Sequence, residues 1–299
     1  NGQQQKVGEV KLEKPIEVLF EGVDVDTYKS IDKFNTNLYH ELNEIKEENL
    51  FLLVGQWCKG GYGEDRKDIG RTIKLFCEAF ANSDSDVALL LKTSFATFSI
   101  LEKEQLNMRL SEIKNMFPKS IKIPNIYLIH GDLTTEEMNE MYNHPKVKSL
   151  VSLTHGEGFG RPLLEATMTG LPVIASKWSG QMDFLTDSHS ILLPGSISEI
   201  PKSVVWDNIL IPQSKWFVVD EKAAKKSFNF AYENLNSFKE KSTELMDINR
   251  EKFSHSNMTK ELGKLLDKFL PTFSKAVNVT LPKLKKVTKE VKLPKLSKV

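Results

Sequence analysis

Residues 149–176 constrain what this chain can fold into more than any other stretch. Residues 149–153 form an apolar run that predicts a β-strand, and a loop with three glycines follows it, Gly156, Gly158 and Gly160. Pro162 suits the first turn of a helix and Gly170 suits its end. A second apolar run, 171–176, predicts another strand. The stretch therefore predicts a strand, a glycine loop, a helix and a strand, which together form one βαβ unit.

The glycine loop has the properties of an anion-binding site. Glycines let the loop turn sharply and let a ligand approach the backbone. The free N–H groups at the start of the following helix point outward and favour a phosphate. Two carboxylates are fixed in the unit, Glu157 in the loop and Glu165 in the first turns of the helix. A carboxylate at the position of Glu165 favours any helix, whereas Glu157 lies between two glycines, where no helix requires it.

This pattern resembles the donor-binding half of retaining glycosyltransferases with the GT-B fold, the group 1 or family 4-like enzymes. The family pattern is EGFG-x-P-x-x-E-A followed by a GxPVIAS strand. The residues that match it are Glu157, Gly158, Phe159, Gly160, Pro162, Glu165, Ala166, Gly170, Pro172 and Val173. The resemblance covers residues 15–270. It implies transfer of a hexose from a nucleoside diphosphate sugar to an acceptor that the sequence does not identify, with retention of anomeric configuration.

The rest of the chain alternates strands and helices. Strands are predicted at 15–20, 49–54, 86–91, 125–129, 190–193 and 215–219. Helices are predicted at 68–80, 100–116, 221–246 and 257–269, and Thr134 with Glu137 predicts a capping box at the start of another. Residues 194–213 read as irregular. The fold class is therefore α/β, a doubly wound Rossmann-like parallel sheet, and the resemblance implies the C-terminal, nucleotide-sugar-binding domain of GT-B enzymes.

The loop after the 49–54 strand is a second candidate for binding the donor. Ligands of doubly wound sheets lie beyond the carboxyl ends of the strands. The resemblance implies that Gly55, Arg66 and Lys67 hold the donor diphosphate, although the spacing is longer than in common members and Lys59 competes for the same role. Arg66 and Lys67 are otherwise a solvated helix start. The helix dipole disfavours cations there, which favours the anion role.

The resemblance also implies the other site residues. Glu157 with Arg66 and Lys67 would form the catalytic group. The amides of Phe159 and Gly160, next to Gly158, would contact sugar or phosphate, and Glu165 would accept the ribose hydroxyls. Backbone groups near Asp132 and Leu133 would hold the base. His130 is read as a core-edge histidine. Family members carry Gly-Gly and Glu where this chain has Ser179-Gly180 and Asp183, which leaves that contact open.

Bulk composition excludes several other classes. The formal net charge of +1 gives no reason to expect nucleic acid as a partner. Cys58 and Cys77, the two cysteines, fit a reducing compartment and thus the cytoplasm. No apolar run is long enough to cross a membrane, and no signal peptide is visible. We expect no cofactor besides the donor and no metal, because His155 and Glu157 have no third ligand in view.

The chain divides into three expected regions. Residues 1–30 form an N-terminal segment and interdomain linker, 31–270 the donor-binding domain, and 271–299 a basic tail rich in proline and lysine. The E-G-V-D sequence at 21–24 is either a family turn, implying an acceptor-binding domain that precedes residue 15 and is absent from this chain, or a simple Gly-Asp turn. Asn1 at the start fits a fragment. The tail nearly repeats LPKLKKV as LPKLSKV; it is read as flexible, with docking on an acidic partner or membrane surface as the alternative.

Two other functions compete with a retaining hexosyltransferase. The first is a non-catalytic nucleotide- or protein-binding module that lacks the acceptor domain. The second is a sugar-nucleotide epimerase on the same fold, which the intact pair Glu157 and Glu165 argues against. The base of the donor stays open among UDP, GDP and ADP, because backbone recognition leaves little side-chain signature.

Overall fold

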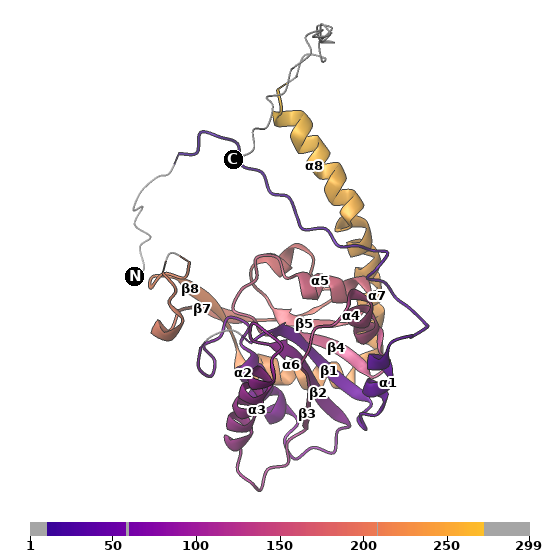
Figure 1. Ribbon diagram of the computed structural model, residues 1–299, viewed down its shortest axis with the longest axis vertical. Helices are drawn as coiled ribbons and strands as arrows, with labels where there is room; N and C mark the ends of the chain where they lie inside the picture. The colour runs from indigo at the N-terminus through magenta and orange to yellow at the C-terminus, as the bar shows by residue number, and fades with distance from the viewer. Residues whose placement is uncertain (1–10, 58–59, 208, 272–299) are drawn as a thin grey trace, which may run out of the picture.

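The computed structural model describes residues 11–57, 60–207 and 209–271 and contains a six-stranded parallel sheet in the order β3-β2-β1-β4-β5-β6 (Figure 1). The strands are β1 (Asn49–Gln56), β2 (Val87–Ser94), β3 (Asn125–Ile129), β4 (Val147–Ser152), β5 (Val173–Ser176) and β6 (Ile191–Leu193). Neighbours in this order pair in parallel. This is the strand order of doubly wound nucleotide-binding sheets, so the predicted fold class is confirmed.

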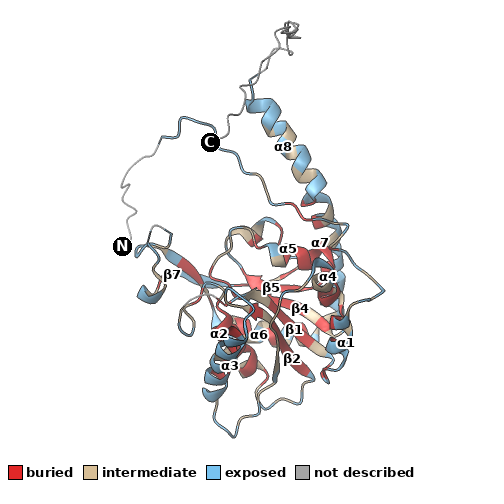
Figure 2. Ribbon diagram, in the orientation of Figure 1, coloured by how far each residue is buried: buried red, intermediate tan, exposed pale blue. Residues whose placement is uncertain are grey.

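Helices cover both faces of the sheet because successive side chains of a strand point to opposite faces. Leu50 and Leu52 of β1 pack in one core with helices α1 (Asn37–Asn43), α4 (Thr135–Asn143), α5 (Arg161–Met168) and α7 (Leu235–Lys252). Phe51 and Leu53 pack in the other with α2 (Ile69–Ala79), α3 (Ile100–Asn115) and α6 (Glu221–Glu233). The buried strands between these two layers are visible in Figure 2.

Local sequence signals fixed several boundaries. Thr134 and Glu137 form the predicted capping box at the start of α4, with both reciprocal hydrogen bonds present. Helix α5 begins after Gly160, whose φ is +94°, and the chain turns away from its end at Gly170, whose φ is +70°. Both glycines hold left-handed backbone, in which other residues are strained.

Three expectations differ from the structure. Residues 15–20 form no strand: Ile16 and Val18 are exposed, and no strand within the described part of the chain pairs with them. The 194–213 region contains β7 (Gly195–Glu199), which pairs antiparallel with β8 (Lys215–Val219), and the short helix η2 (Lys202–Val204). The long predicted helix is two helices, α6 and α7, separated at Asn234, whose side chain bonds to the carbonyl of Phe230.

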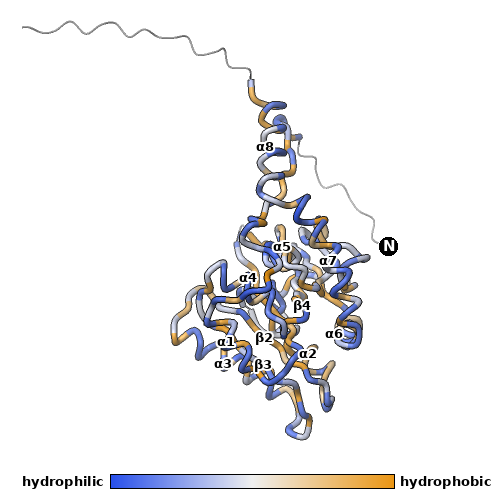
Figure 3. Tube along the Cα trace, turned by 90° about the vertical axis from the view of Figure 1, so that its right-hand side faces the viewer, coloured by the Kyte–Doolittle hydropathy of each residue, from blue (hydrophilic) through white to orange (hydrophobic). Residues whose placement is uncertain are grey.

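The last helix, α8 (His255–Phe269), extends away from the body of the molecule (Figures 1 and 3). It has no buried residue, and Leu262, Leu266 and Phe269 are exposed on it. The basic tail predicted at 271–299 lies outside the described residues from 272 onward. Within the described ranges, no helix is both long and apolar enough to span a bilayer.

Candidate functional site

The candidate site lies where β1 and β4 end side by side. The chain leaves β1 for α2 on one face of the sheet, and leaves β4 for α5 on the opposite face. Two loops that depart in opposite directions open a crevice at the carboxyl edge of a parallel sheet. The predicted residues Gly55, Arg66 and Lys67 belong to the first loop, and Glu157, Gly158, Phe159 and Gly160 belong to the second.

Both cations of the first loop contact the carboxylate of the second. Lys67 Nζ lies 2.6 Å from Glu157 Oε1, and Arg66 Nη1 lies 3.2 Å from Glu157 Oε2. Arg66 Nη1 also donates to the Gly156 carbonyl at 2.9 Å. The Glu157 side chain is 8% exposed and that of Lys67 13%, whereas that of Arg66 is 48% exposed. One carboxylate thus faces two cations, and the excess of positive charge favours an added anion.

The backbone of Glu157 is fixed from the β5 side. Its N–H donates to Ser179 Oγ at 2.7 Å, and its carbonyl accepts from Ser179 Oγ and from the Gly180 N–H, each at 3.1 Å. A Cβ on Gly180 would lie 2.1 Å from the Gly158 carbonyl oxygen, so only glycine fits there. Ser179 itself has φ +65°. Sequence reasoning left the contact of Ser179 and Gly180 open; they hold the loop that carries Glu157.

The loop that carries the cations is fixed from the β4 side. The Arg66 carbonyl accepts from the His155 N–H at 2.9 Å and from Thr154 Oγ1 at 3.1 Å. The Lys67 side chain passes over Gly55, 3.5 Å from where a Cβ would stand. The two loops therefore hold each other through backbone groups as well as through the charged side chains.

The start of α5 offers free donors next to these charges. The amides of Phe159 and Gly160 donate to no group among the described residues. A narrow pocket leads to this point between Lys67, Glu157, Gly160 and Pro162. The Phe159 ring packs against Phe184 and Phe253, with centroids 5.3 and 6.1 Å away.

Glu165 lies apart from this charged group. Its Oε1 accepts from Arg161 Nε at 2.8 Å, and its side chain is 8% exposed beneath the half-exposed Arg161. Burial raises the pKa of Glu165, and burial together with the Glu165 charge raises the pKa of Tyr28 to about 12. Sequence reasoning missed Arg161 and Tyr28 as its neighbours. Tyr28 lies far away in the sequence, and no local pattern marks it.

Asp132 and Leu133 follow β3, two strands away from β1, and contact neither Arg66, Lys67 nor Glu157 within the described part of the chain. Asp132 is exposed, and Leu133 packs against the core. His130 is a core-edge histidine as expected: its side chain is 3% exposed and its Nε2 lies 3.4 Å from Glu102 Oε1.

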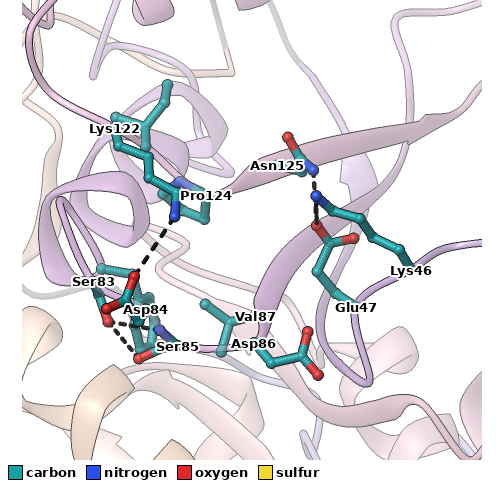
Figure 4. A pocket seen from close by; sticks show the side chains of 12 residues that line it. Lys46, Glu47, Ser83, Asp84, Ser85, Asp86, Val87, Lys122, Pro124 and Asn125 are labelled. Carbon is teal, nitrogen blue, oxygen red and sulfur yellow. Dashed lines mark hydrogen bonds and ion pairs between the residues drawn. The ribbon is translucent and has the colours of Figure 1, made fainter.

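A second hollow lies at the opposite, amino-terminal edge of the sheet (Figure 4). Its polar groups largely satisfy one another: Glu47 accepts from Asn125 at 2.7 Å, and Lys122 lies 3.8 Å from Asp84. Ligands of doubly wound sheets bind at the carboxyl edge, so we place the functional site at that edge and not in this hollow. Among the residues described, no three His, Cys, Asp or Glu side chains group as a metal site would. Lys59, the alternative cation, lies outside the described residues.

Comparison with known proteins adds three observations. The family model described as glycosyl transferases group 1 matches residues 119–203, which contain the β4–α5–β5 unit. No curated protein matches the chain. Anabaena Alr3699/HepE, solved in complex with UDP and glucose, superposes with a TM-score of 0.55 at 13% identity over 84% of this chain and 57% of that one.

Two further solved structures share the fold. Sucrose-phosphate synthase (tll1590) from Thermosynechococcus elongatus has a TM-score of 0.52 at 17% identity, covering 83% of this chain and 51% of its own. The C-terminal domain of the glycosyl transferase group 1 family protein LpcC from Francisella tularensis has a TM-score of 0.52 at 15% identity, over 78% of this chain and 100% of its own. The chain thus spans little more than half of HepE and of the synthase, and all of the isolated LpcC domain.

Proposed function

We propose that this chain is the donor-binding half of a retaining glycosyltransferase that transfers a hexose from a nucleoside diphosphate sugar. The observation that carries the proposal is the contact of Arg66 and Lys67 with Glu157 beside the free amides of the α5 start. The fold shared with glycosyltransferases and the partial family match support it. We keep residues 31–270 as the extent of the donor-binding domain.

The two cations would bind the donor diphosphate in place of the Glu157 carboxylate. As the bond from the sugar C1 to the phosphate oxygen breaks, negative charge grows on the diphosphate, and Arg66 and Lys67 stabilise it. The acceptor hydroxyl attacks C1 from the same face and passes its proton to the departing phosphate. Glu157, released from the cations, would then lie beside the sugar and stabilise positive charge at C1. The positive charges of Arg66 and Lys67 take the place of a divalent metal in the proposed reaction.

Glu165 would bind the ribose hydroxyls with its two carboxylate oxygens. The Arg161 side chain now bonded to it is half exposed and would have to give up this contact. Asp132 and Leu133 would supply backbone groups to the base, because they follow β3 at the same edge of the sheet. The base remains one of uracil, guanine or adenine.

The acceptor would be held by a second domain. The matched chains of HepE and of the synthase are nearly twice as long as the part that this chain covers, and the apolar face of α8 is exposed. The buried free thiol of Cys77 fits the proposed cytoplasmic setting. A non-catalytic donor-binding module is the alternative; the complete group of Arg66, Lys67 and Glu157 favours the enzyme.

Calorimetric titration tests the proposal. UDP-, GDP- and ADP-glucose are titrated separately into the chain with EDTA present, alongside Lys67→Ala and Lys46→Ala. Lys46, on the opposite edge, provides the same charge change as a control. We expect one nucleotide sugar to bind the wild-type chain and the Lys46 variant equally, and Lys67→Ala to weaken it roughly ten-fold or more. Binding to none of the three, or equal binding by both variants, would overturn the proposed donor site.

A further inference from the structure

Two buried carboxylates flank the cations of the site. Asp65 and Asp68, on either side of Arg66 and Lys67, have no exposed surface. Asp65 accepts the N–H of Ile69 at 3.2 Å at the start of α2. Asp68 Oδ2 accepts from Arg71 Nε at 2.7 Å, and Arg71 Nη2 lies 2.6 Å from the same oxygen. Among the described residues neither carboxylate contacts Arg66, Lys67 or Glu157, so neither belongs to the charged group described above.

Asp68 determines the direction of the chain after Lys67. Its φ is +52° and its ψ +38°, a left-handed conformation in a non-glycine residue. A residue in this conformation reverses the local backbone, so it sets how Lys67 leaves the loop relative to α2. Left-handed backbone is unfavourable in residues with a side chain, and the contacts of the Asp68 side chain hold Asp68 in it.

His155 connects this turn to two other elements. Its N–H donates to the Arg66 carbonyl, and its own carbonyl accepts from the Phe217 N–H at 3.1 Å. Its Nδ1 lies 2.6 Å from the Phe217 carbonyl, which only accepts, so Nδ1 carries the proton. The ring stacks on Trp216 of β8 with centroids 4.0 Å apart. This leaves Nε2 pointing to Asp68, 3.8 Å from its Oδ2, with no hydrogen-bond partner among the described residues.

Arg71 connects the same turn to α6. Its Nη1 lies 3.9 Å from Glu221 Oε1, at the first position of α6. The 65–68 turn is thereby held on three sides, by α2 through Arg71, by α6 through Glu221, and by the β7–β8 hairpin through His155. Two cations that only faced solvent would not need a turn held by these contacts.

We propose that Asp68, together with Arg71 and His155, is a positioning group that holds Arg66 and Lys67 against Glu157 in the geometry that receives the diphosphate. The identity of the ligand in this inference rests on the proposed function. The restraint on the loop does not depend on it. Asp68 acts through Lys67 and touches no substrate, so it is a positioning residue and not a catalytic one.

Burying the carboxylates of Asp65 and Asp68 costs free energy that a turn without buried charges does not cost. Burial raises the pKa of both Asp65 and Asp68 to about 6, because a carboxylate away from water is disfavoured in its charged form. Burial also lowers the pKa of His155. Buried groups with shifted pKa values cluster at functional sites, and this cluster supports the two cations of the candidate site.

The first test measures the restraint without a ligand. Hydrogen exchange of residues 60–70 and 154–157 is compared in the wild type, Asp68→Asn and Glu78→Gln. Asparagine accepts left-handed backbone but loses the ion pair with Arg71. Glu78 joins α2 to α6 through Lys225 at 2.8 Å, away from the crevice, and serves as the matched control. We expect Asp68→Asn alone to speed exchange of the His155 amide, which donates to the Arg66 carbonyl. Equal exchange in all three proteins would overturn the restraint.

The second test measures binding of free UDP, GDP and ADP. We expect Asp68→Asn to weaken the nucleoside diphosphate that binds the wild type by roughly ten- to a hundred-fold, as misplaced groups do. In a protein that already carries Lys67→Ala and Arg66→Ala, the same change is expected to have no effect, because Asp68 acts through those side chains. An equal loss in both backgrounds would show that Asp68 does not act through the cations.

Two outcomes separate this inference from the proposed function. If the wild type binds none of the three diphosphates, the proposed function fails, and hydrogen exchange alone decides on the positioning group. If Asp68→Asn does not fold, His155→Phe replaces it in both tests. Phenylalanine keeps the stacking on Trp216 and removes the bond to the Phe217 carbonyl. Unchanged exchange and unchanged affinity in His155→Phe would overturn the inference.

Discussion

The ammonium of Lys67 and the carboxylate of Glu157 lie 2.6 Å apart, although 90 residues separate them in the chain. Each comes from a loop that leaves a different strand, β1 or β4, toward a different face of the sheet. The contact exists because the sheet places these two strands side by side. The carboxylate therefore occupies the place on Lys67 that a phosphate would take, which makes Glu157 a competitor of the proposed ligand.

Replacing Glu157 by Gln should separate binding from catalysis. Without the competing carboxylate, we expect free nucleoside diphosphate to bind roughly five-fold more tightly, the value of a partly exposed ion pair. Transfer from the sugar donor should fall by roughly a hundred-fold or more, because charge at C1 loses its stabilising group. Calorimetry and a radiolabelled transfer assay with the complete enzyme measure the two effects. Glu48→Gln, which breaks an ion pair with Lys146 at the opposite edge, is the control. Weaker diphosphate binding in Glu157→Gln would contradict the competition.

Replacing Gly180 by Ala should damage the same loop through sterics alone. The new Cβ would lie 2.1 Å from the Gly158 oxygen and 2.6 Å from the Gly158 carbonyl carbon, so the backbone must move. We expect a loss of about 2 kcal/mol in the free energy of unfolding, together with loss of donor binding. Chemical denaturation and calorimetry measure both. Gly263→Ala in α8 meets no atom within 4 Å and should stabilise by about 1 kcal/mol. A Gly180 variant as stable as wild type would contradict the contact.

Glu102 should make stability depend on acid. Although its burial opposes ionisation, hydrogen bonds from Thr97 and from the Phe95 and Ala96 amides lower its pKa from 4.5 to about 2. A lowered folded-state pKa stabilises above pH 4.5, and this contribution is lost as the pH falls from 4.5 toward 2. We expect Glu102→Gln to cost about 2 kcal/mol at pH 7 and much less at pH 3. Urea unfolding at the two pH values checks this. A cost that is the same at both would show that the charge is irrelevant.

Asp65 should have the opposite dependence. Burial raises its pKa from 3.8 to about 6, so the folded protein holds the proton more tightly than the unfolded chain. Asp65 therefore favours folding below about pH 4, and this contribution disappears as the pH rises from 4 to 6. Asp65→Asn keeps an oxygen for the Ile69 amide and removes the buried charge. We expect it to raise the free energy of unfolding by about 1–2 kcal/mol at pH 7, with little change at pH 4. A Tm that falls at pH 7 would contradict this sign.

The sequence predicted most of the fold because its signals are local. Apolar runs located the strands from β1 to β6, and the Thr134 capping box and Pro162 marked helix starts. Strand β7 was missed because Ile197 is the only large apolar side chain in its five residues, and its pairing with β8 is a tertiary contact. The break at Asn234 was missed because apolar periodicity continues across it.

Residue types located part of the site, and tertiary contacts formed the rest. Glu157 and Lys67 were predicted from loop composition and family resemblance, and their contact follows from strand order. Sequence reasoning passed over Asp68 and gave His155 only a minor metal role, because their contacts with Arg71 and Phe217 involve buried groups on separate elements. A left-handed backbone at Asp68 has no signature in the surrounding letters. The assignments of Glu165, Asp132 and Leu133 to the donor stay predictions.

The ring of Phe253 connects the start of α8 to the glycine loop. Phe253, at the joint between α7 and α8, packs its ring 6.1 Å from that of Phe159, between two of the loop glycines. Helix α8 stands clear of the body and has no buried residue of its own. The start of α8 and the residues beside Glu157 therefore share one aromatic cluster, although the rest of the helix lies away from the body.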